Sequence, residues 1–173
     1  MKKIIQLLVF IIAVNFQINL LADIPHYINF KYILNQSEAG KKAQKVLKTK
    51  LDSGIKKLQE KEKNAQEEEK KIIQQKKIIT PEEYKKKVDA LRNKVSNLQK
   101  ERNKLLNDVA KQRTSARNQL LKALNPIIKD YMAEKNIKMV IDKKNLLLAD
   151  DNLDITKDII TKLNQKLKTI KFN

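Results

Sequence analysis

The chain has 173 residues, with 38 Lys or Arg against 20 Asp or Glu, which gives a formal net charge of +18 at pH 7. Charged residues make up 34% and aromatic residues 5% of the sequence, a composition that favours long solvated helices over a compact enzyme core. Cysteine is absent, which excludes disulfides, thiolate metal sites and a cysteine nucleophile. The positive charge favours anionic partners without identifying them, since nucleic acid, lipid headgroups and acidic unfolded chains all respond to it.

Residues 1–22 have the organisation of a secretory signal peptide. Lys2 and Lys3 precede an apolar stretch from Ile4 to Val14, and Ala22 supplies a small residue for cleavage. The alternative is an uncleaved membrane anchor, but the apolar stretch is shorter than the roughly 20 residues that span a bilayer. We therefore expect an exported protein whose signal peptide is removed.

A short strand is predicted at 27–30, because Ile28 and Phe30 place apolar side chains on alternate positions among β-forming residues. Ser37 then has the position of an N-cap for a first long helix. Gly40 falls in the first turn of that helix, where a glycine is less unfavourable than in the middle of a helix.

Two long amphipathic helices are predicted between residues 38 and 124. Their apolar positions recur at three- and four-residue steps, which is sustained in the second helix as a heptad pattern typical of a coiled coil. These positions are Leu47, Leu51, Ile55, Leu58, Ala65 and Ile72 in the first helix, and Tyr84, Val88, Leu91, Val95, Leu98, Leu105, Val109 and Ala116 in the second. Arg102 and Gln112 interrupt the second set. Each helix reaches about 60 Å at 1.5 Å per residue.

The two helices are separated by a helix start signal at Thr80-Pro81. Proline lacks an amide hydrogen and fits the first turn of a helix, Thr80 is a favourable N-cap, and Glu83 stands where a capping-box partner is needed. The chain is therefore predicted to turn near 78–84 and return as an antiparallel arm.

The remaining chain predicts a small β body. Pro126 indicates a kink or boundary in a helix that reaches Glu134, and residues 137–142 and 146–149 read as two strands joined by a turn at 143–145. A last helix is expected to begin with Thr156 as its N-cap. The fold class is α+β: a coiled-coil hairpin arm at 38–124 is inserted in a β body at 23–37 and 125–173. Because about three strands are only marginally stable in water, the body is expected to oligomerise.

The segments at both ends of this body resemble the Skp/OmpH family of periplasmic chaperones. The resemblance rests on Tyr27 to Ala43, which contains L-N-Q-S-E-A-G-K-K-A, and on Lys135 to Asp142, Leu147 to Asp150 and Leu153 to Thr156, which ends in D-I-T. Asn136 departs from the pattern, because that family often has Gly there. The resemblance implies a homotrimer whose strands form a β-barrel and whose arms surround a cavity. There the family holds unfolded outer-membrane proteins without ATP.

The arm is strongly basic, with 23 Lys and Arg against 11 Asp and Glu from Lys41 to Arg113. One interpretation is a solvated helix surface, and the other is an electropositive wall that attracts acidic clients, anionic lipid or lipopolysaccharide. The candidate client-contacting residues are Lys70, Lys71, Ile72, Ile73, Lys76, Lys77, Ile78, Ile79, Tyr84, Lys85, Lys86, Lys87 and Arg92. The apolar members of this set have a simpler alternative role, which is to close the end of the coiled coil.

The candidate trimerisation residues are Ile28, Phe30, Met139, Ile141, Leu147 and Leu148. No enzymatic activity, catalytic residue, cofactor or metal is expected. His26 is the sole histidine, and Asp150, Asp151 and Asp154 lack EF-hand spacing, so a loop that caps the last helix is expected there. A structural coiled-coil spacer of the envelope remains an alternative. Specific nucleic-acid binding is not expected, since no DNA-binding motif or aromatic cluster is present.

Overall fold

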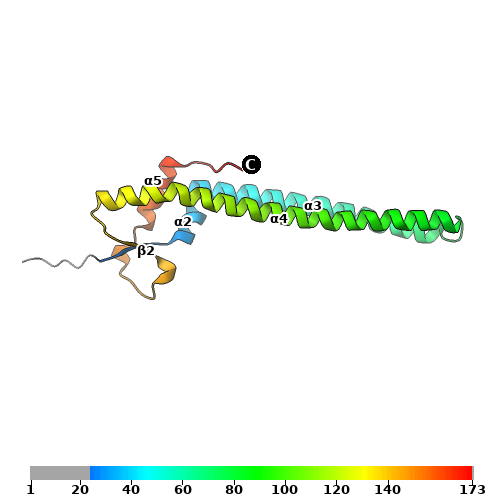
Figure 1. The fold of residues 1–173 in the computed structure, drawn as a ribbon, viewed down its shortest axis with the longest axis horizontal. Helices are drawn as coiled ribbons and strands as arrows, with labels where there is room; N and C mark the ends of the chain where they lie inside the picture. Colours follow the sequence, from blue (N-terminus) through cyan, green and yellow to red (C-terminus); the bar gives the residue numbers. More distant parts are fainter. Residues whose placement is uncertain (1–23, 173) are drawn as a thin grey trace, which may run out of the picture.

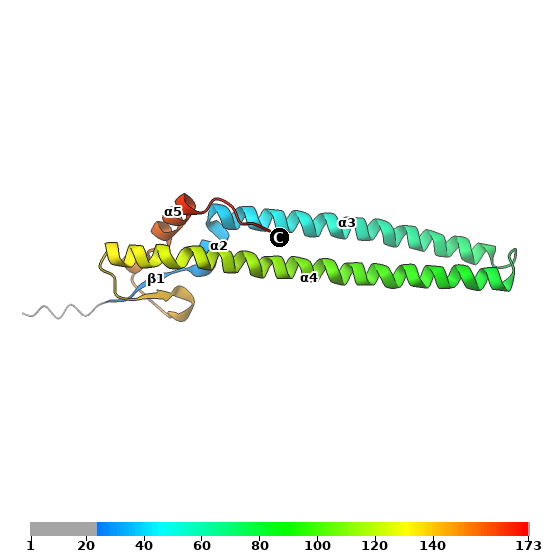
Figure 2. The same cartoon turned by 45° about the horizontal axis from the view of Figure 1, so that its top comes forward.

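The computed structural model describes residues 24–172, which form a small body and a long projecting helical hairpin (Figures 1 and 2). In chain order the elements are β1 (His26–Ile28), α2 (Phe30–Gln36), α3 (Glu38–Gln75), α4 (Pro81–Glu134), β2 (Val140–Asp142), the 3-10 helices η1 (Lys143–Asn145) and η2 (Asp151–Leu153), and α5 (Thr156–Lys166). The predicted signal peptide lies outside the described residues. None of the helices in this range has the length and apolarity that crossing a bilayer would require.

The arm is formed by α3 and the first part of α4, which run side by side in opposite directions, as predicted (Figure 2). The seam buries Leu47, Leu58 and Ala65 from α3 against Leu98 and Val109 from α4. The predicted seam position Val95 is wrong, because this side chain is 52% exposed. A two-helix arm gives each helix a single neighbour, so residues at the flank of the stripe stay open to water.

The predicted interruption of the seam at Arg102 is filled by an ion pair across the two helices. Arg102 Nη2 lies 2.6 Å from Glu62 Oε1, and both side chains are partly buried. Gln112 Oε1, at the second interruption, accepts a hydrogen bond of 3.0 Å from Lys50 Nζ. Polar residues therefore keep the two helices in register where apolar ones are missing.

The turn of the hairpin has the capping geometry predicted from the sequence. Thr80 is the N-cap of α4, Pro81 is its first residue, and the capping box with Glu83 is complete. Glu83 N–H donates to Thr80 Oγ1 at 3.2 Å, and Thr80 N–H donates to Glu83 Oε2 at 3.4 Å. Ser37 likewise caps α3, with its Oγ accepting from Gly40 N–H.

The body is held together by a core that the base of the arm shares with α2 and α5. Its largest fully buried members are Ile33, Leu124, Ile127, Ile159 and Leu163. Strands β1 and β2 pair in parallel, with Tyr27 opposite Ile141, and an isolated bridge joins Tyr27 to Asp154. The sheet thus joins the beginning of the described chain to the segments that follow α4.

One prediction at the start of the body is wrong, and one in α4 is wrong in part. Phe30 begins α2 and does not continue the strand, because Asn29 acts as an N-cap whose Oδ1 accepts from Tyr32 N–H. Helix α4 continues through Pro126 to Glu134, so the predicted helix to Glu134 is confirmed and a boundary at Pro126 is absent. The missing hydrogen bond at a proline is unfavourable, but burial of Leu124 and Ile127 on the core face offsets it.

Two predictions in the closing segment also fail. Residues 146–149 form no strand, and the sheet of the described residues consists of β1 and β2. Thr156 does not cap α5, because the N-cap position is Ile155, which makes no side-chain capping bond. Thr156 Oγ1 instead accepts from Asn29 N–H at 2.8 Å, so this buried hydroxyl ties α5 to the end of β1.

Candidate functional site

The outer end of the arm carries exposed apolar side chains beside a buried one. Ile72 is buried at the end of the seam, whereas Ile73 and Ile78 are exposed, Ile78 to 82%. Ile79 and Tyr84 are half-buried, and Lys76 Nζ lies 5.7 Å from the centre of the Tyr84 ring. The end of the coiled coil is therefore closed by Ile72, Ile79 and Tyr84, and Ile73 and Ile78 remain open to water.

The candidate cations of the arm all lie on its surface, where each is exposed. From residue 70 to residue 87, seven lysines stand against two glutamates, of which Glu83 is engaged in the capping box. Lys87 Nζ donates to Gln75 Oε1 at 2.6 Å, and Arg92 is 3.6 Å from Asp89. The outer end of the arm thus has a high density of positive charge around two exposed isoleucines, Ile73 and Ile78.

The candidate trimerisation residues divide into two groups. Ile28 is buried in the protomer's own core, Phe30 packs against that core, and Ile141 is half-buried in β2. Met139 is exposed, and Leu147 and Leu148 are 103% and 92% exposed. Leucines so fully open on a folded body form an apolar feature that a single protomer does not cover.

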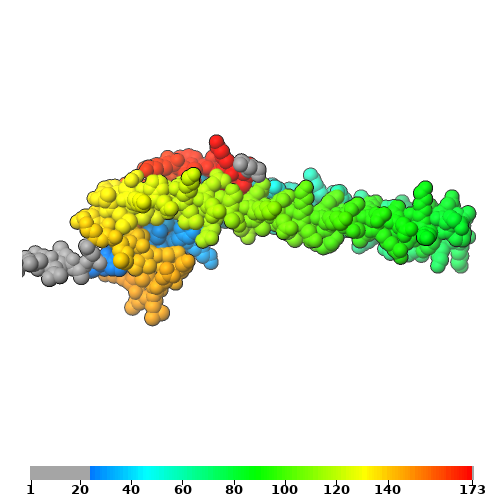
Figure 3. Space-filling model, viewed as in Figure 1, coloured from blue at the N-terminus to red at the C-terminus, as the bar shows by residue number. Residues whose placement is uncertain are grey.

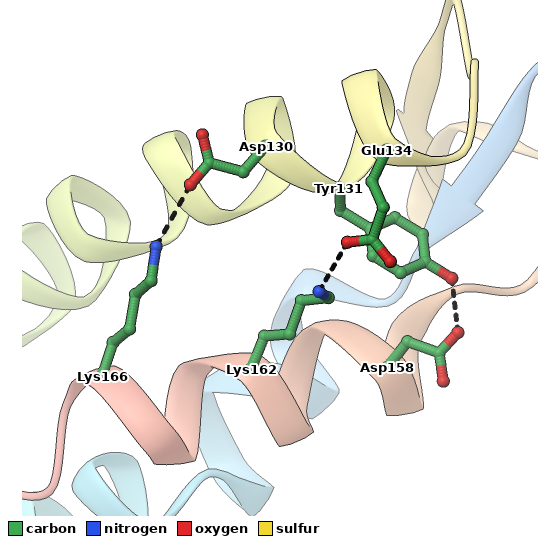
Figure 4. Close-up of polar contacts among 6 residues, drawn as sticks. All are labelled: Asp130, Tyr131, Glu134, Asp158, Lys162 and Lys166. Atoms are coloured by element: carbon green, nitrogen blue, oxygen red, sulfur yellow. Dashed lines mark hydrogen bonds and ion pairs between the residues drawn. The ribbon is translucent and has the colours of Figure 1, made fainter.

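A polar clasp between α4 and α5 fixes the C-terminal helix to the base of the arm (Figure 4). Tyr131 OH donates to Asp158 Oδ2 at 2.5 Å, Lys162 Nζ lies 2.8 Å from Glu134 Oε2, and Lys166 Nζ lies 3.1 Å from Asp130 Oδ2. The sequence analysis missed this clasp. Its signal was the four-residue spacing of 130 and 134 and of 158, 162 and 166, which places each set on one face of its helix.

The clasp shifts two pKa values. Burial, together with the hydrogen bond to Asp158 and its negative charge, raises the pKa of Tyr131 to about 12. The hydrogen bond and the charge of Lys162 lower the pKa of Glu134. Both shifts favour the protonation states in which the clasp is complete.

The two aspartates Asp150 and Asp154, which the sequence analysis considered as metal ligands, form local backbone hydrogen bonds. Asp150 Oδ1 accepts from Asn152 N–H and Asp154 Oδ1 accepts from Thr156 N–H, so both carboxylates cap local backbone. Within residues 24–172, no group of three or more His, Asp or Glu is arranged to hold a metal ion. His26 lies in β1, and its buried Nδ1 has no hydrogen-bond partner among the described residues.

A basic helical hairpin carried by a small mixed body defines the class of this protein, and its family follows from sequence comparison. The family model described as outer membrane protein (OmpH-like) matches residues 26–163. The chain belongs to this OmpH-like family.

Comparison with solved structures gives the same fold. The crystal structure of a candidate outer membrane chaperone (OmpH-like) from Caulobacter crescentus CB15 matches with a TM-score of 0.79 and 20% sequence identity, over 87% of this chain and 90% of that one. A search of curated protein sequences finds no significant match.

Proposed function

We propose that this protein is a periplasmic holdase chaperone that binds unfolded outer-membrane proteins without ATP and keeps them from aggregating. The observation that carries the proposal is membership of the OmpH-like family over residues 26–163, combined with a basic arm whose outer end projects far from the body (Figure 1). The chaperone likeness of the Caulobacter structure supports the same class.

We further propose that three protomers join through the body and place their arms around a cavity. The two-stranded sheet is too small to be stable by itself in water, and Leu147 and Leu148 have no cover within the protomer. Pairing of residues 146–149 with a neighbouring protomer would satisfy their backbone and cover both leucines. The predicted strand at 146–149 would then form only on assembly.

The arm suits a client that has no fixed structure. Long-range attraction by lysines and weak contacts from Ile73 and Ile78 are both tolerant of client sequence. Several arms around one cavity add many weak contacts, which raises capture without imposing a fold on the client. Anionic lipid or lipopolysaccharide would respond to the same charge, and we propose it only as a secondary partner.

The assembly is tested by the mass of the mature protein in solution. We expect a trimer, and we expect the double variant L147S/L148S to lose it while each protomer keeps its helical circular dichroism. Leu106 is exposed on the arm, so L106S is the matched control and should remain trimeric. A wild-type monomer, or equal behaviour of the two variants, would contradict the proposed interface.

The holdase activity is tested by diluting a urea-unfolded outer-membrane β-barrel into stoichiometric trimer. We expect suppression of light scattering and a complex with one unfolded barrel, and no complex with the folded barrel. A structural spacer would give neither result, and a nucleic-acid-binding protein would prefer an oligonucleotide to the client. Either finding would replace the proposal.

A further inference from the structure

The base of the arm has an open groove on the face that α2 occupies. Two adjoining hollows, each of about 550 Å³, share Leu34 and Arg117 in their walls. We call them together the base groove. Volumes of this size are typical of ligand-binding pockets. Figure 3 shows α2, in blue, in the recess between α4 and the orange segment that follows β2.

The half of the base groove that lies along the arm has an apolar floor. It is formed by Leu34, Leu47, Leu51, Val109 and Ala116. Ala43 also lines it, and its small side chain leaves the space open. A floor of this composition fits apolar side chains of an extended chain.

The rim of the groove carries positive charge without acidic partners. Lys48, Arg113 and Arg117 line it, all three are exposed, and no described acidic side chain forms an ion pair with them. The middle of the arm is different, because there Lys61 pairs with Glu101 and Lys94 pairs with Glu68, both at 2.6 Å. The described acidic side chains therefore leave the charge of these three cations at the groove uncompensated.

The second half of the groove, next to β2, is also cationic. Lys31, Lys143 and Lys144 line it with a single acid, Asp142, which lies 3.8 Å from Lys144. Arg117 stands where the two halves meet and stacks over Phe30, 5.6 Å from the ring centre. An occupant that places apolar groups on the floor would have its polar flanks among these cations.

The opposite face of the arm base is closed by the chain itself. Gln119 Nε2 donates to Lys171 O at 2.8 Å, Lys171 N–H donates to Gln119 Oε1 at 3.3 Å, and Ile170 is buried. Figure 1 shows this C-terminal segment above the hairpin and α2 below it. The groove is thus the open side of a base that is covered on the other side.

We infer that the base groove is a docking site for an extended apolar segment of an unfolded client that is flanked by Asp or Glu side chains. This inference rests on the proposed holdase function and locates one client contact at the base of the arm, far from its tip. Apolar side chains would cover the leucine floor, and the flanking carboxylates would pair with Arg113 and Arg117. Charge-assisted pairs of this kind are stronger than neutral hydrogen bonds.

The site is tested by site-specific cross-linking, which the absence of cysteine in the chain makes clean. Gln44 lines the groove and is exposed, so Q44C receives a benzophenone label. Ser96 is exposed on the middle of the arm, so S96C carries the control label. The probes are two short peptides of alternating Leu and Ser, one with Asp and one with Lys at both ends. We expect the Asp-ended peptide to cross-link at residue 44 well above residue 96.

Charge reversal supplies the second measurement. R113E should weaken binding of the Asp-ended peptide about tenfold, whereas K104E, the same charge change on the exposed middle of the arm, should change it less than about twofold. Equal effects of the two variants would show general attraction and overturn the site. If the label at residue 44 cross-links to a second copy of the chain before peptide is added, the groove is an interface between copies. That result would also overturn the site.

The two proposals fail in distinguishable ways. If wild-type protein suppresses client aggregation and R113E does so with unchanged potency, the groove proposal is overturned and the holdase stands. If the groove binds the Asp-ended peptide selectively but wild-type protein never protects an unfolded barrel, the site stands as a peptide site and the holdase function falls.

Discussion

Replacement of Gly40 by alanine is predicted to destabilise the protein, although alanine is the better helix former. A Cβ atom added at Gly40 would lie 1.9 Å from the carbonyl oxygen of Leu34 and 2.9 Å from its carbonyl carbon. That neighbour is backbone and cannot rotate away, so α2 would have to move relative to α3. The gain of up to about 1 kcal/mol in helix propensity is outweighed by overpacking that costs about 3 kcal/mol. We expect G40A to destabilise the protein by about 2 kcal/mol.

The only other glycine of the chain provides the matched control. A Cβ at Gly54 would lie 2.5 Å from Leu105 Cδ2, the end of a flexible side chain that can change rotamer. G54A should therefore stay within about 1 kcal/mol of wild type. Thermal unfolding followed by circular dichroism should show G40A melting roughly 4–8 °C lower and G54A nearly unchanged. A G40A protein as stable as G54A would refute the reasoning from backbone overlap.

Three further predictions concern the tip, the clasp and the seam. T80A removes the side-chain acceptor of the capping box and should cost about 1 kcal/mol, seen as faster hydrogen exchange in the first turn of α4. Burial and Asp158 raise the pKa of Tyr131 to about 12 from 10.0, so the folded state holds that proton more tightly. Stability should fall as pH rises from 10 to 12, and Y131F should flatten this fall in urea-unfolding titrations. A double-mutant cycle on Glu62 and Arg102, measured by urea unfolding, should give a favourable coupling of about 0.5–1 kcal/mol. A coupling of zero would contradict a role for this ion pair in the seam.

The sequence predicted the arm well because its structure depends on local signals. The heptad spacing fixed two helices, and Thr80 with Pro81 fixed the start of the second, since capping and proline geometry act within one turn. Ser37 was found for the same reason. Val95 was misplaced because a heptad pattern does not state how many neighbours the helix has.

The body was predicted less accurately because its elements are decided by distant partners. Phe30 has strand propensity, but Asn29 acts as the N-cap of a helix that begins there. The backbone N–H of Asn29 donates to Thr156 Oγ1, which lies more than 100 residues further along the chain. Pro126 signals a boundary locally, and burial on both sides of it keeps α4 intact. Asn136 occupies the left-handed region at a φ of 54°, a conformation that Gly and Asn adopt more readily than other residues.

The charge of the candidate site could be predicted from the sequence, whereas the exposure of its side chains and the base groove could not. The charge of the arm could be counted from the sequence, but which isoleucines are exposed depends on how the turn folds, and Ile72 and Ile73 differ although they are adjacent. The base groove left no sequence pattern, because it results from α2 lying against the hairpin and from small residues on α3. Gly40 shows this directly: its position in the first turn made it look merely tolerated, whereas the close approach of Leu34 requires it.

The contacts along the arm imply that its base is rigid and its outer part yields. The base shares the large core with α2 and α5 and is fastened by the Tyr131 clasp. Beyond it, the middle of the arm has only a small buried cluster around Leu58, Ala65 and Leu98. Regions with few buried apolar contacts open at lower free energy, so the outer arm should bend before the base moves. Under the proposed holdase function, bending of the outer arms would allow clients of different sizes to be enclosed while the body keeps its structure.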